Sequence, residues 1–231
     1  MECVIVGAGG HGRVVLDILR HEGRHEVVGF LDSNPDLHGQ HVDGVEVLGP
    51  LQRLTGLKEK GVRGAIVSIG HNGTRRSFCE EVQRLGFEAI NAIHPSANIA
   101  SNVSLGRGVV VAAGVLVCAH CQIGDAVILN TGCLIDHETM IGTACHICPG
   151  VKIAGRVTVE SGAFVGIGST IIQHLRVGHD AVVGAGAVVL NDVAPMSTVV
   201  GLPAREVKSL RNPNEFSEWL MPETIGNSSE P

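Results

Sequence analysis

The stretch LNTGCLIDHETMIGTACHICPGVKI, residues 129–153, decides the fold, because an aliphatic side chain returns at every sixth position. A six-residue period matches neither an amphipathic helix nor the simple alternation of a half-buried strand. It is typical of a parallel β-helix, in which three short strands form one triangular coil. The aliphatic ladder runs without a break through Ile93, Ile99, Leu105, Val111, Val117, Ile123, Leu129, Ile135, Ile141, Ile147, Ile153, Val159, Val165, Ile171, Val177, Val183 and Val189.

Three hexads make a coil of eighteen residues, so residues 93–189 predict a prism of a little over five coils. At a strand spacing of ~4.8 Å this prism is about 25 Å tall. Side chains eighteen positions apart are then expected to stack on neighbouring coils. The composition agrees, because 3% aromatic residues and 31 glycines suit a narrow core of small aliphatic side chains with tight corners.

The residues before the ladder follow another pattern, in which strands at 2–6, 27–31 and 65–69 alternate with helical segments. We predict a small Rossmann-like domain with a parallel sheet over residues 1–92 and a β-helix domain over 93–207. His94-Pro95 is the expected hinge, and a polar tail at 208–231 is expected to be partly disordered. The first helix should bury Val14, Val15, Ile18 and Leu19, and the last strand before the prism should span residues 87–93.

The turn after the first strand carries Gly7, Gly9 and Gly12 in G-x-G-x-x-G spacing, and Asp32 follows twenty residues after Gly12. Such glycines let a phosphate or sugar approach the backbone, and the helix N-terminus that follows favours an anion. The domain is only about half the size that NAD requires. The pattern therefore favours a nucleotide-type ligand over NAD, and the alternative is that the glycines only permit a tight turn.

Charge and hydropathy exclude several classes of partner. A net charge of −6 and a pI near 6.0 provide no general attraction to nucleic acid or to an anionic membrane. The longest apolar stretch, residues 109–118, is too short to span a bilayer and belongs to the ladder. Seven cysteines without a secretory signal indicate a reduced, cytoplasmic protein.

The cysteines Cys121, Cys133 and Cys145 resemble a metal site at first sight, but the ladder argues against one. Each lies four positions after a rung residue, in a phase otherwise filled by small or apolar side chains. This phase places them in the core on different faces of the triangle, whereas zinc requires ligands that converge on one point. We therefore predict buried thiols and no bound metal.

His137 is the strongest catalytic candidate. It lies two positions after rung residue Ile135 and cannot point into the core, and Asp136 and Glu138 flank it. A carboxylate that holds one ring nitrogen leaves the other to act as a base. Gly155, eighteen residues later, should stack beside His137 and offer both space and a backbone N–H of the kind that forms an oxyanion hole.

Together these motifs resemble the hexapeptide-repeat acyltransferases, and within them the PglD-type nucleotide-aminosugar N-acetyltransferases, near the perosamine N-acetyltransferases and sialic acid O-acetyltransferases. The resemblance covers about residues 3–207 and implies a left-handed coil. The residues that carry it are VGAGGHG (6–12), FLD (30–32), IGHN (69–72), IHPS (93–96), NT…HE within 130–138, VKIAG (151–155) and GLPAR (201–205).

The resemblance implies that His137 is the general base and that Glu138 raises its basicity. It implies a homotrimer with active sites between subunits. The residues implied to contact the nucleotide-linked amino sugar are Gly9, Gly10, His11, Asp32, Ser33 and Gly70. Those implied to contact the co-substrate acetyl-CoA are His146, Gly155, Ile167 and Ala185, with the segment around Pro203 closing over it.

One departure concerns the nucleotide. Relatives that bind UDP tend to carry a second Asp and a Lys after the strand-two Asp, whereas Ser33 and Asn34 stand here. The nucleotide is therefore expected to be GDP or dTDP. Arg75 and Arg76 are basic enough to serve a diphosphate, although Arg75 can equally be a solvated helix residue.

The function expected from the sequence is acetyl transfer from acetyl-CoA to the amine of a nucleotide-linked sugar, of 4-amino-4,6-dideoxy type, for surface polysaccharide or glycan synthesis. One alternative is O-acetylation of a sialic acid-type sugar with the same histidine. A second is a non-catalytic trimeric binding protein. An NAD-dependent oxidoreductase ranks last.

Overall fold

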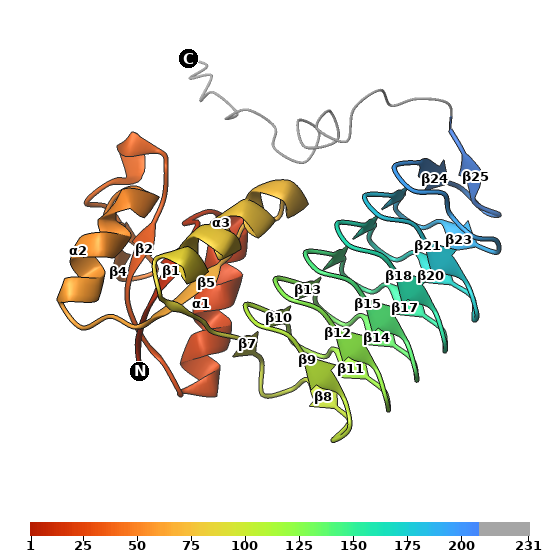
Figure 1. Ribbon diagram of the computed structural model, residues 1–231, viewed down its shortest axis with the longest axis horizontal. Helices are drawn as coiled ribbons and strands as arrows, with labels where there is room; N and C mark the ends of the chain where they lie inside the picture. Colours follow the sequence, from red (N-terminus) through yellow and green to blue (C-terminus); the bar gives the residue numbers. More distant parts are fainter. Residues whose placement is uncertain (208–231) are drawn as a thin grey trace, which may run out of the picture.

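The computed structural model describes residues 1–207, which form an N-terminal α/β domain and a prism of short strands (Figure 1). The predicted C-terminal tail lies outside the described residues. None of the described helices is long and apolar enough to cross a bilayer. The N-terminal elements are β1 (Glu2–Val6), α1 (Gly10–Glu22), β2 (Glu26–Leu31), η1 (Pro35–Leu37), β3 (His41–Val42), β4 (Val45–Glu46), η2 (Leu51–Arg53), α2 (Leu54–Glu59), β5 (Gly64–Val67), α3 (Asn72–Arg84) and β6 (Glu88–Ala89).

The N-terminal sheet confirms the predicted Rossmann-like domain. Its four strands are parallel and lie in the order β2-β1-β5-β6, while β3 and β4 form a separate antiparallel pair. One local prediction is wrong: α1 buries Val15, Leu16, Ile18 and Leu19, but Val14 is 40% exposed. The helix packs on its own sheet and on the first coils of the prism, and contact with both surfaces moves its buried face toward Leu16.

The strand predicted over residues 87–93 is also corrected. It is two strands in different sheets, β6 beside β5 and β7 (Ala92–Ile93) beside β10 (Val110–Val111). The break falls at Asn91, whose side chain donates to the Gly106 carbonyl and accepts from the Val109 N–H. The chain therefore changes sheets before the predicted hinge at His94-Pro95, and His94 already bonds through its backbone N–H to Val111 in the prism.

The prism is the predicted left-handed parallel β-helix, of about six turns. Three sheets form its faces, which we name the β7, β8 and β9 faces after their first strands. The remaining strands are β8 (Asn98–Ile99), β9 (Ser104–Leu105), β11 (Leu116–Val117), β12 (Gln122–Ile123), β13 (Ile128–Leu129), β14 (Leu134–Ile135), β15 (Met140–Ile141), β16 (His146–Ile147), β17 (Lys152–Ile153), β18 (Thr158–Val159), β19 (Phe164–Val165), β20 (Thr170–Ile171), β21 (Arg176–Val177), β22 (Val182–Val183), β23 (Val188–Val189), β24 (Thr198–Val200) and β25 (Arg205–Glu206).

Every strand pair from β7 to β23 joins residues eighteen positions apart, as between Val111 and Leu129. The ladder residues end these strands and are buried from Val111 onward. The prism continues past Val189 because Val193 bridges to Val177 and Val199 pairs with Val183, each sixteen positions away. The strict hexads predicted a little over five coils, and this shorter last coil brings the prism to about six turns.

The chain turns at three corners of the triangle. We name the turn from the β7 face to the β8 face the first corner, the next the second corner and the turn back to the β7 face the third corner. Cys121, Cys133 and Cys145 lie at the second, first and third corners respectively, and all three are buried. Their burial confirms the prediction that these thiols are core residues. The three lie at three different corners.

A buried arginine joins the two bodies. Arg75 on α3 is fully buried, and its Nε donates to the Ala126 carbonyl at 2.7 Å while Nη2 donates to Ala144 at 2.8 Å and Cys145 at 3.1 Å, all at the third corner. Its Nη1 donates to the carbonyls of the loop before α3. Burial lowers its pKa to about 10, which leaves the guanidinium charged at neutral pH. Both sequence interpretations of Arg75 were wrong, because it contacts neither solvent nor an open phosphate site.

We predict that Arg75→Met lowers the free energy of unfolding by about 3 kcal/mol, because several buried carbonyls lose their donor at once. Urea denaturation at one fixed protein concentration measures this. Arg84→Met is the matched control on the same helix, since Arg84 is 69% exposed and bonds only Glu81. Its effect should stay within about 0.5 kcal/mol. Equal midpoints for the two variants would contradict this role of Arg75.

Candidate active site

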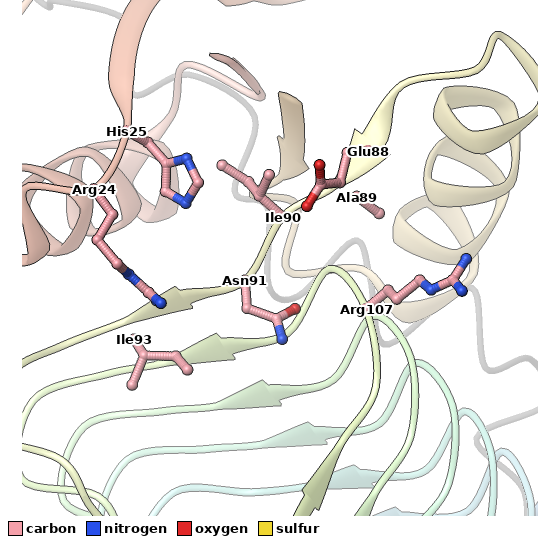
Figure 2. Close-up of a pocket in the computed structure, with 8 residues that line it drawn as sticks. All are labelled: Arg24, His25, Glu88, Ala89, Ile90, Asn91, Ile93 and Arg107. Atoms are coloured by element: carbon pink, nitrogen blue, oxygen red, sulfur yellow. The ribbon is translucent and has the colours of Figure 1, made fainter. Parts of the chain in front are cut away.

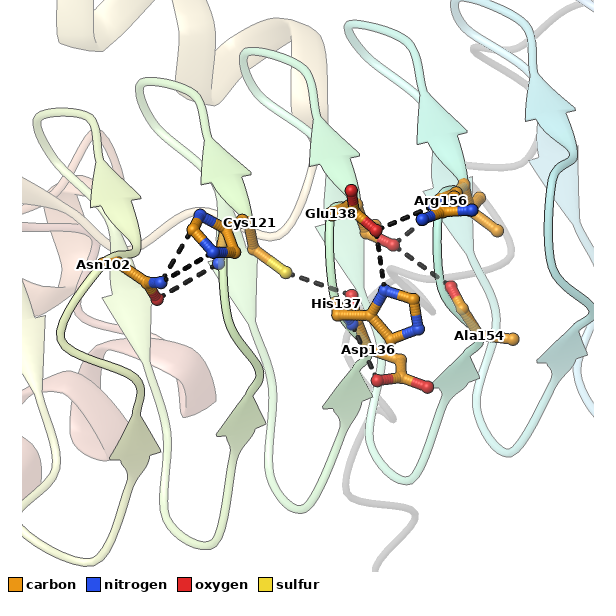
Figure 3. A network of polar contacts seen from close by, with 10 residues as sticks. Asn102, Cys121, Asp136, His137, Glu138, Ala154 and Arg156 are labelled. Atoms are coloured by element: carbon orange, nitrogen blue, oxygen red, sulfur yellow. Dashed lines mark hydrogen bonds and ion pairs between the residues drawn. The ribbon is translucent and has the colours of Figure 1, made fainter.

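The second corner presents a chain of three functional side chains (Figure 3). The Nδ1 atom of His137 lies 3.1 Å from the Glu138 carboxylate, which accepts a hydrogen bond of 2.7 Å from Arg156 Nε. The carboxylate of Asp136 accepts the backbone N–H of His137 at 2.7 Å. The Arg156 and His137 contacts together lower the pKa of Glu138, so it is ionised and holds the imidazole from one side. This arrangement leaves Nε2 of His137 as the free ring nitrogen.

Gly155 lies directly against that free nitrogen, as the eighteen-residue register predicts. A Cβ atom at position 155 would lie 2.6 Å from His137 Nε2, so any side chain there would displace the imidazole. The backbone N–H of Gly155 has no hydrogen-bond acceptor among the described residues. The corner therefore brings a ring nitrogen without a hydrogen-bond partner among the described residues next to an unused backbone donor.

The second corner has an unusual backbone conformation that the sequence analysis did not predict. His120, Glu138, Arg156 and His174 stack at eighteen-residue spacing, and each has a φ between 57° and 63°. The equivalent positions of the first corner, from Gly114 to Gly186, are glycines. A non-glycine residue in this region costs roughly 1–3 kcal/mol, so side chains are retained here against a conformational preference. Arg156 was predictable from the sequence, because it stands eighteen residues after Glu138 and directly after Gly155.

The glycine loop of the N-terminal domain has the tight geometry that its spacing predicted. Gly7 has a φ of 108°, and a Cβ on Gly12 would lie 2.2 Å from the Gly7 carbonyl oxygen. Gly9 and Gly10 instead face open space, and Gly9 begins α1 without a side-chain cap. The open N-terminus of α1 is suited to an anionic ligand.

Asp32 and Ser33 follow β2 beside this loop. The two carboxylate oxygens of Asp32 accept backbone N–H groups of Ala8 at 2.8 Å and Asn34 at 2.9 Å, which braces the glycine loop. Ser33 is exposed. A structural role for Asp32 is therefore present, and its contact with a nucleotide stays a prediction.

His146 lies with the predicted sugar-binding residues, although the resemblance assigned it to acetyl-CoA. Its ring centroid is 6.4 Å from that of His11, and its Nδ1 is 3.3 Å from the Gly70 carbonyl oxygen. Burial lowers the pKa of His146 to about 3 and that of His11 to about 4, with Arg75 adding to both shifts. Both rings are neutral at pH 7, and Nε2 of His11 is buried without a partner in the described chain.

The other predicted acetyl-CoA residues lie elsewhere. Ile167 and Ala185 stack at the first corner, where both are exposed, and Ile167 is 57% exposed. His137 and Gly155 lie at the second corner, while Gly9, His11 and Gly70 lie over the β7 face. One chain therefore does not bring all the predicted residues together.

A separate cavity of about 410 Å³ lies between the domains and contains none of the predicted site residues (Figure 2). Arg24 and Arg107 flank it, with His25 and Glu88 above Asn91. Asn91 is already engaged in joining the sheets, so this cavity belongs to the domain junction.

Comparison with known proteins identifies the relationship. The chain matches the PglD N-terminal domain family over residues 2–82. It is 39% identical to a perosamine N-acetyltransferase from Caulobacter crescentus solved with CoA and GDP-perosamine, with a TM-score of 0.87 over 90% of this chain and 98% of that one. The chain belongs to the PglD-type sugar N-acetyltransferase family.

Two further proteins are similar to this chain at lower identity. The acetyltransferase domain of PglB from Neisseria gonorrhoeae is 30% identical, with a TM-score of 0.82 over 89% of this chain and 99% of that one. The same domain has been solved with acetyl coenzyme A. A UDP-N-acetylbacillosamine N-acetyltransferase from Bacillus subtilis is 30% identical over 111 residues, 47% of this chain, and the match spans only half of that relative's length.

We predict that the half-buried histidines His11 and His146 make the fold sensitive to acid. Their pKa values lie below the ordinary imidazole value near 6.5, so the unfolded chain binds more protons as the pH falls. The free energy of unfolding should therefore fall between about pH 6.5 and pH 4, by up to about 1.4 kcal/mol per pH unit for each histidine.

Urea denaturation across this pH range measures the slope. His146→Gln removes one titrating group and should flatten the slope, whereas His41→Gln, at an exposed position, should leave it unchanged. An identical slope in the wild-type protein and the His146→Gln variant would contradict the assignment.

Proposed function

We propose that the protein transfers the acetyl group of acetyl-CoA to the amine of a nucleotide-linked amino sugar. The observation that carries the proposal is the His137–Glu138–Arg156 chain with Gly155 against the free ring nitrogen. The family supports it, since the named relatives are N-acetyltransferases. This favours an amine acceptor over the hydroxyl of a sialic acid-type sugar.

In the proposed reaction the neutral sugar amine attacks the thioester carbon, and His137 Nε2 takes the amine proton as the C–N bond forms. Nδ1–H of the resulting imidazolium donates to the Glu138 carboxylate, which Arg156 holds in place. The N–H of Gly155 stabilises the oxyanion of the tetrahedral intermediate. The C–S bond then breaks, and the thiolate of CoA receives the proton from His137.

The separation of the predicted residues supports a homotrimer with sites between subunits. The glycine loop lies over the β7 face, whereas His137 lies at the second corner and Ile167 at the first. In the proposed assembly the amino sugar held by one N-terminal domain reaches His137 of a neighbouring prism, and acetyl-CoA lies between adjacent prisms. Closed rotational symmetry repeats this site identically around the trimer.

The proposed acceptor is a GDP-linked 4-amino-4,6-dideoxy sugar. The relatives matched over nearly their whole length include enzymes solved with GDP-perosamine. Ser33 and Asn34 replace the acidic and basic residues expected for UDP, and Asn34 is engaged in capping η1. We place the reaction in the cytoplasm, a compartment that suits seven unpaired thiols.

We predict that His137→Ala lowers kcat by about 10²–10⁴-fold, because the amine loses its proton acceptor. The assay measures thiol release from acetyl-CoA with GDP-perosamine. Two structures of the Caulobacter enzyme are of variants that replace one histidine, by asparagine or by alanine. Wild-type turnover in His137→Ala would refute the assignment.

His179→Ala is the matched control. His179 has the same 51% side-chain exposure as His137 and the same 3.1 Å contact from Nδ1 to a following carboxylate, that of Asp180. It lies at the third corner without the Gly155 arrangement, so its activity should stay within about twofold of wild type. UDP- and dTDP-linked 4-amino sugars and N-acetylneuraminic acid complete the acceptor panel. The amine of N-acetylneuraminic acid is already acetylated, so only its hydroxyls can accept. Faster turnover with it than with all three nucleotide sugars would overturn the N-transfer proposal.

A further inference from the structure

Three potential metal ligands converge where the N-terminal domain meets the prism. Asp17 and His21 lie on α1, and His94 follows β7 in the first coil. One ligand atom from each lies within 4.8 Å of the other two. Within residues 1–207 no other group of three His, Cys, Asp or Glu side chains converges in this way. None of the three takes part in the proposed acetyl transfer.

Helix α1 and the first coil of the prism each hold part of this cluster in place. A spacing of four residues puts Asp17 and His21 on one face of α1. The same helix packs through Val15 and Ile18 into the cluster that contains Ala92 and Ala112 of the prism. The backbone N–H of His94 bonds to Val111, which fixes the loop after β7. Docking of the domains therefore creates the cluster, and an unfolded chain does not contain it.

Each imidazole has one nitrogen already oriented by a neighbour. Nδ1 of His21 lies 2.9 Å from the Asp17 carbonyl oxygen, the kind of contact by which metal-binding histidines donate their second ring nitrogen. Nδ1 of His94 accepts the backbone N–H of Ser96 at 3.1 Å and lies 2.7 Å from the Ser96 hydroxyl. A metal ion on Nε2 of His94 therefore requires the other tautomer, in which Nδ1–H donates to the Ser96 hydroxyl. The rings themselves lie side by side, with centroids 5.4 Å apart.

Two imidazoles and one carboxylate suit Zn²⁺, whose tetrahedral sites have ligand atoms about 3.3 Å apart. The side chains of His21 and Asp17 are 57% and 64% exposed, which gives them room to rotate toward that spacing when an ion binds. The two nearest arginines of α1, Arg13 and Arg20, are both engaged with Asp43.

The sequence predicted no bound metal, an expectation argued from the cysteines. We propose, against that expectation, that Asp17, His21 and His94 form a zinc site that fastens α1 to the first coil of the prism. Zinc that binds only the folded chain raises the free energy of unfolding by mass action. A chelator that removes the ion removes this added stability. The site lies on the helix whose N-terminus carries the glycine loop, so the ion fixes the position of the sugar-binding domain relative to the prism.

The test uses the full chain after treatment with EDTA. Competition with a chromophoric zinc chelator measures affinity, and thermal unfolding with and without Zn²⁺ measures stabilisation. We expect one Zn²⁺ per chain and a higher Tm with the ion. His94→Gln and Asp17→Asn should each weaken binding at least tenfold and abolish the Tm increase.

His41→Gln is the control histidine, at an exposed position outside the cluster, and should bind zinc as the wild type does. Asp17 is 64% exposed on a helix surface, so Asp17→Asn should keep the apo Tm and separate lost binding from lost folding. Zinc affinity unchanged in both cluster variants, or no zinc binding by the wild type, would overturn the proposal. Acetyl transfer without zinc leaves the proposed function intact and is the expected result.

Discussion

The structure depends on one constraint, parallel pairing of strands at a constant offset of eighteen residues. Each pair from β7 to β23, such as Ile135 with Ile153, has this offset, and only the last coil departs from it. Residues far apart in sequence therefore contact one another at the corners. His137 meets Gly155 and Glu138 meets Arg156 for this reason alone. A single residue inserted between Glu138 and Gly155 would move Gly155 away from His137 and Arg156 away from Glu138.

The second requirement is a rigid junction between the domains, which Arg75 provides with backbone carbonyl acceptors at the third corner. Burying a charge without a carboxylate partner is costly unless every donor is bonded. Here the hydrogen bonds of the guanidinium span α3, the loop before it and the prism. The position of the glycine loop over the β7 face follows from this junction.

Periodicity made much of the fold predictable. The ladder from Ile93 to Val189 established the coil, the inward cysteines and the stacking of Gly155 on His137. The split of residues 87–93 between two sheets was not predictable, because both halves look extended and only the side chain of Asn91 marks the change. The burial of Arg75 was not predictable, because its acceptors are backbone carbonyls and every residue type has one. The grouping of His146 with His11 likewise depends on how two domains dock.

In the proposed trimer, the base and the sugar-binding loop of each site come from different chains. Complementation tests this arrangement: His137→Ala and Gly9→Phe chains, each expected to be inactive alone, are combined in mixed trimers. We expect recovery of about a quarter of wild-type activity, because random mixing unites an intact loop with an intact neighbouring base in that share of sites. Mixed trimers with no more activity than either variant alone would contradict it.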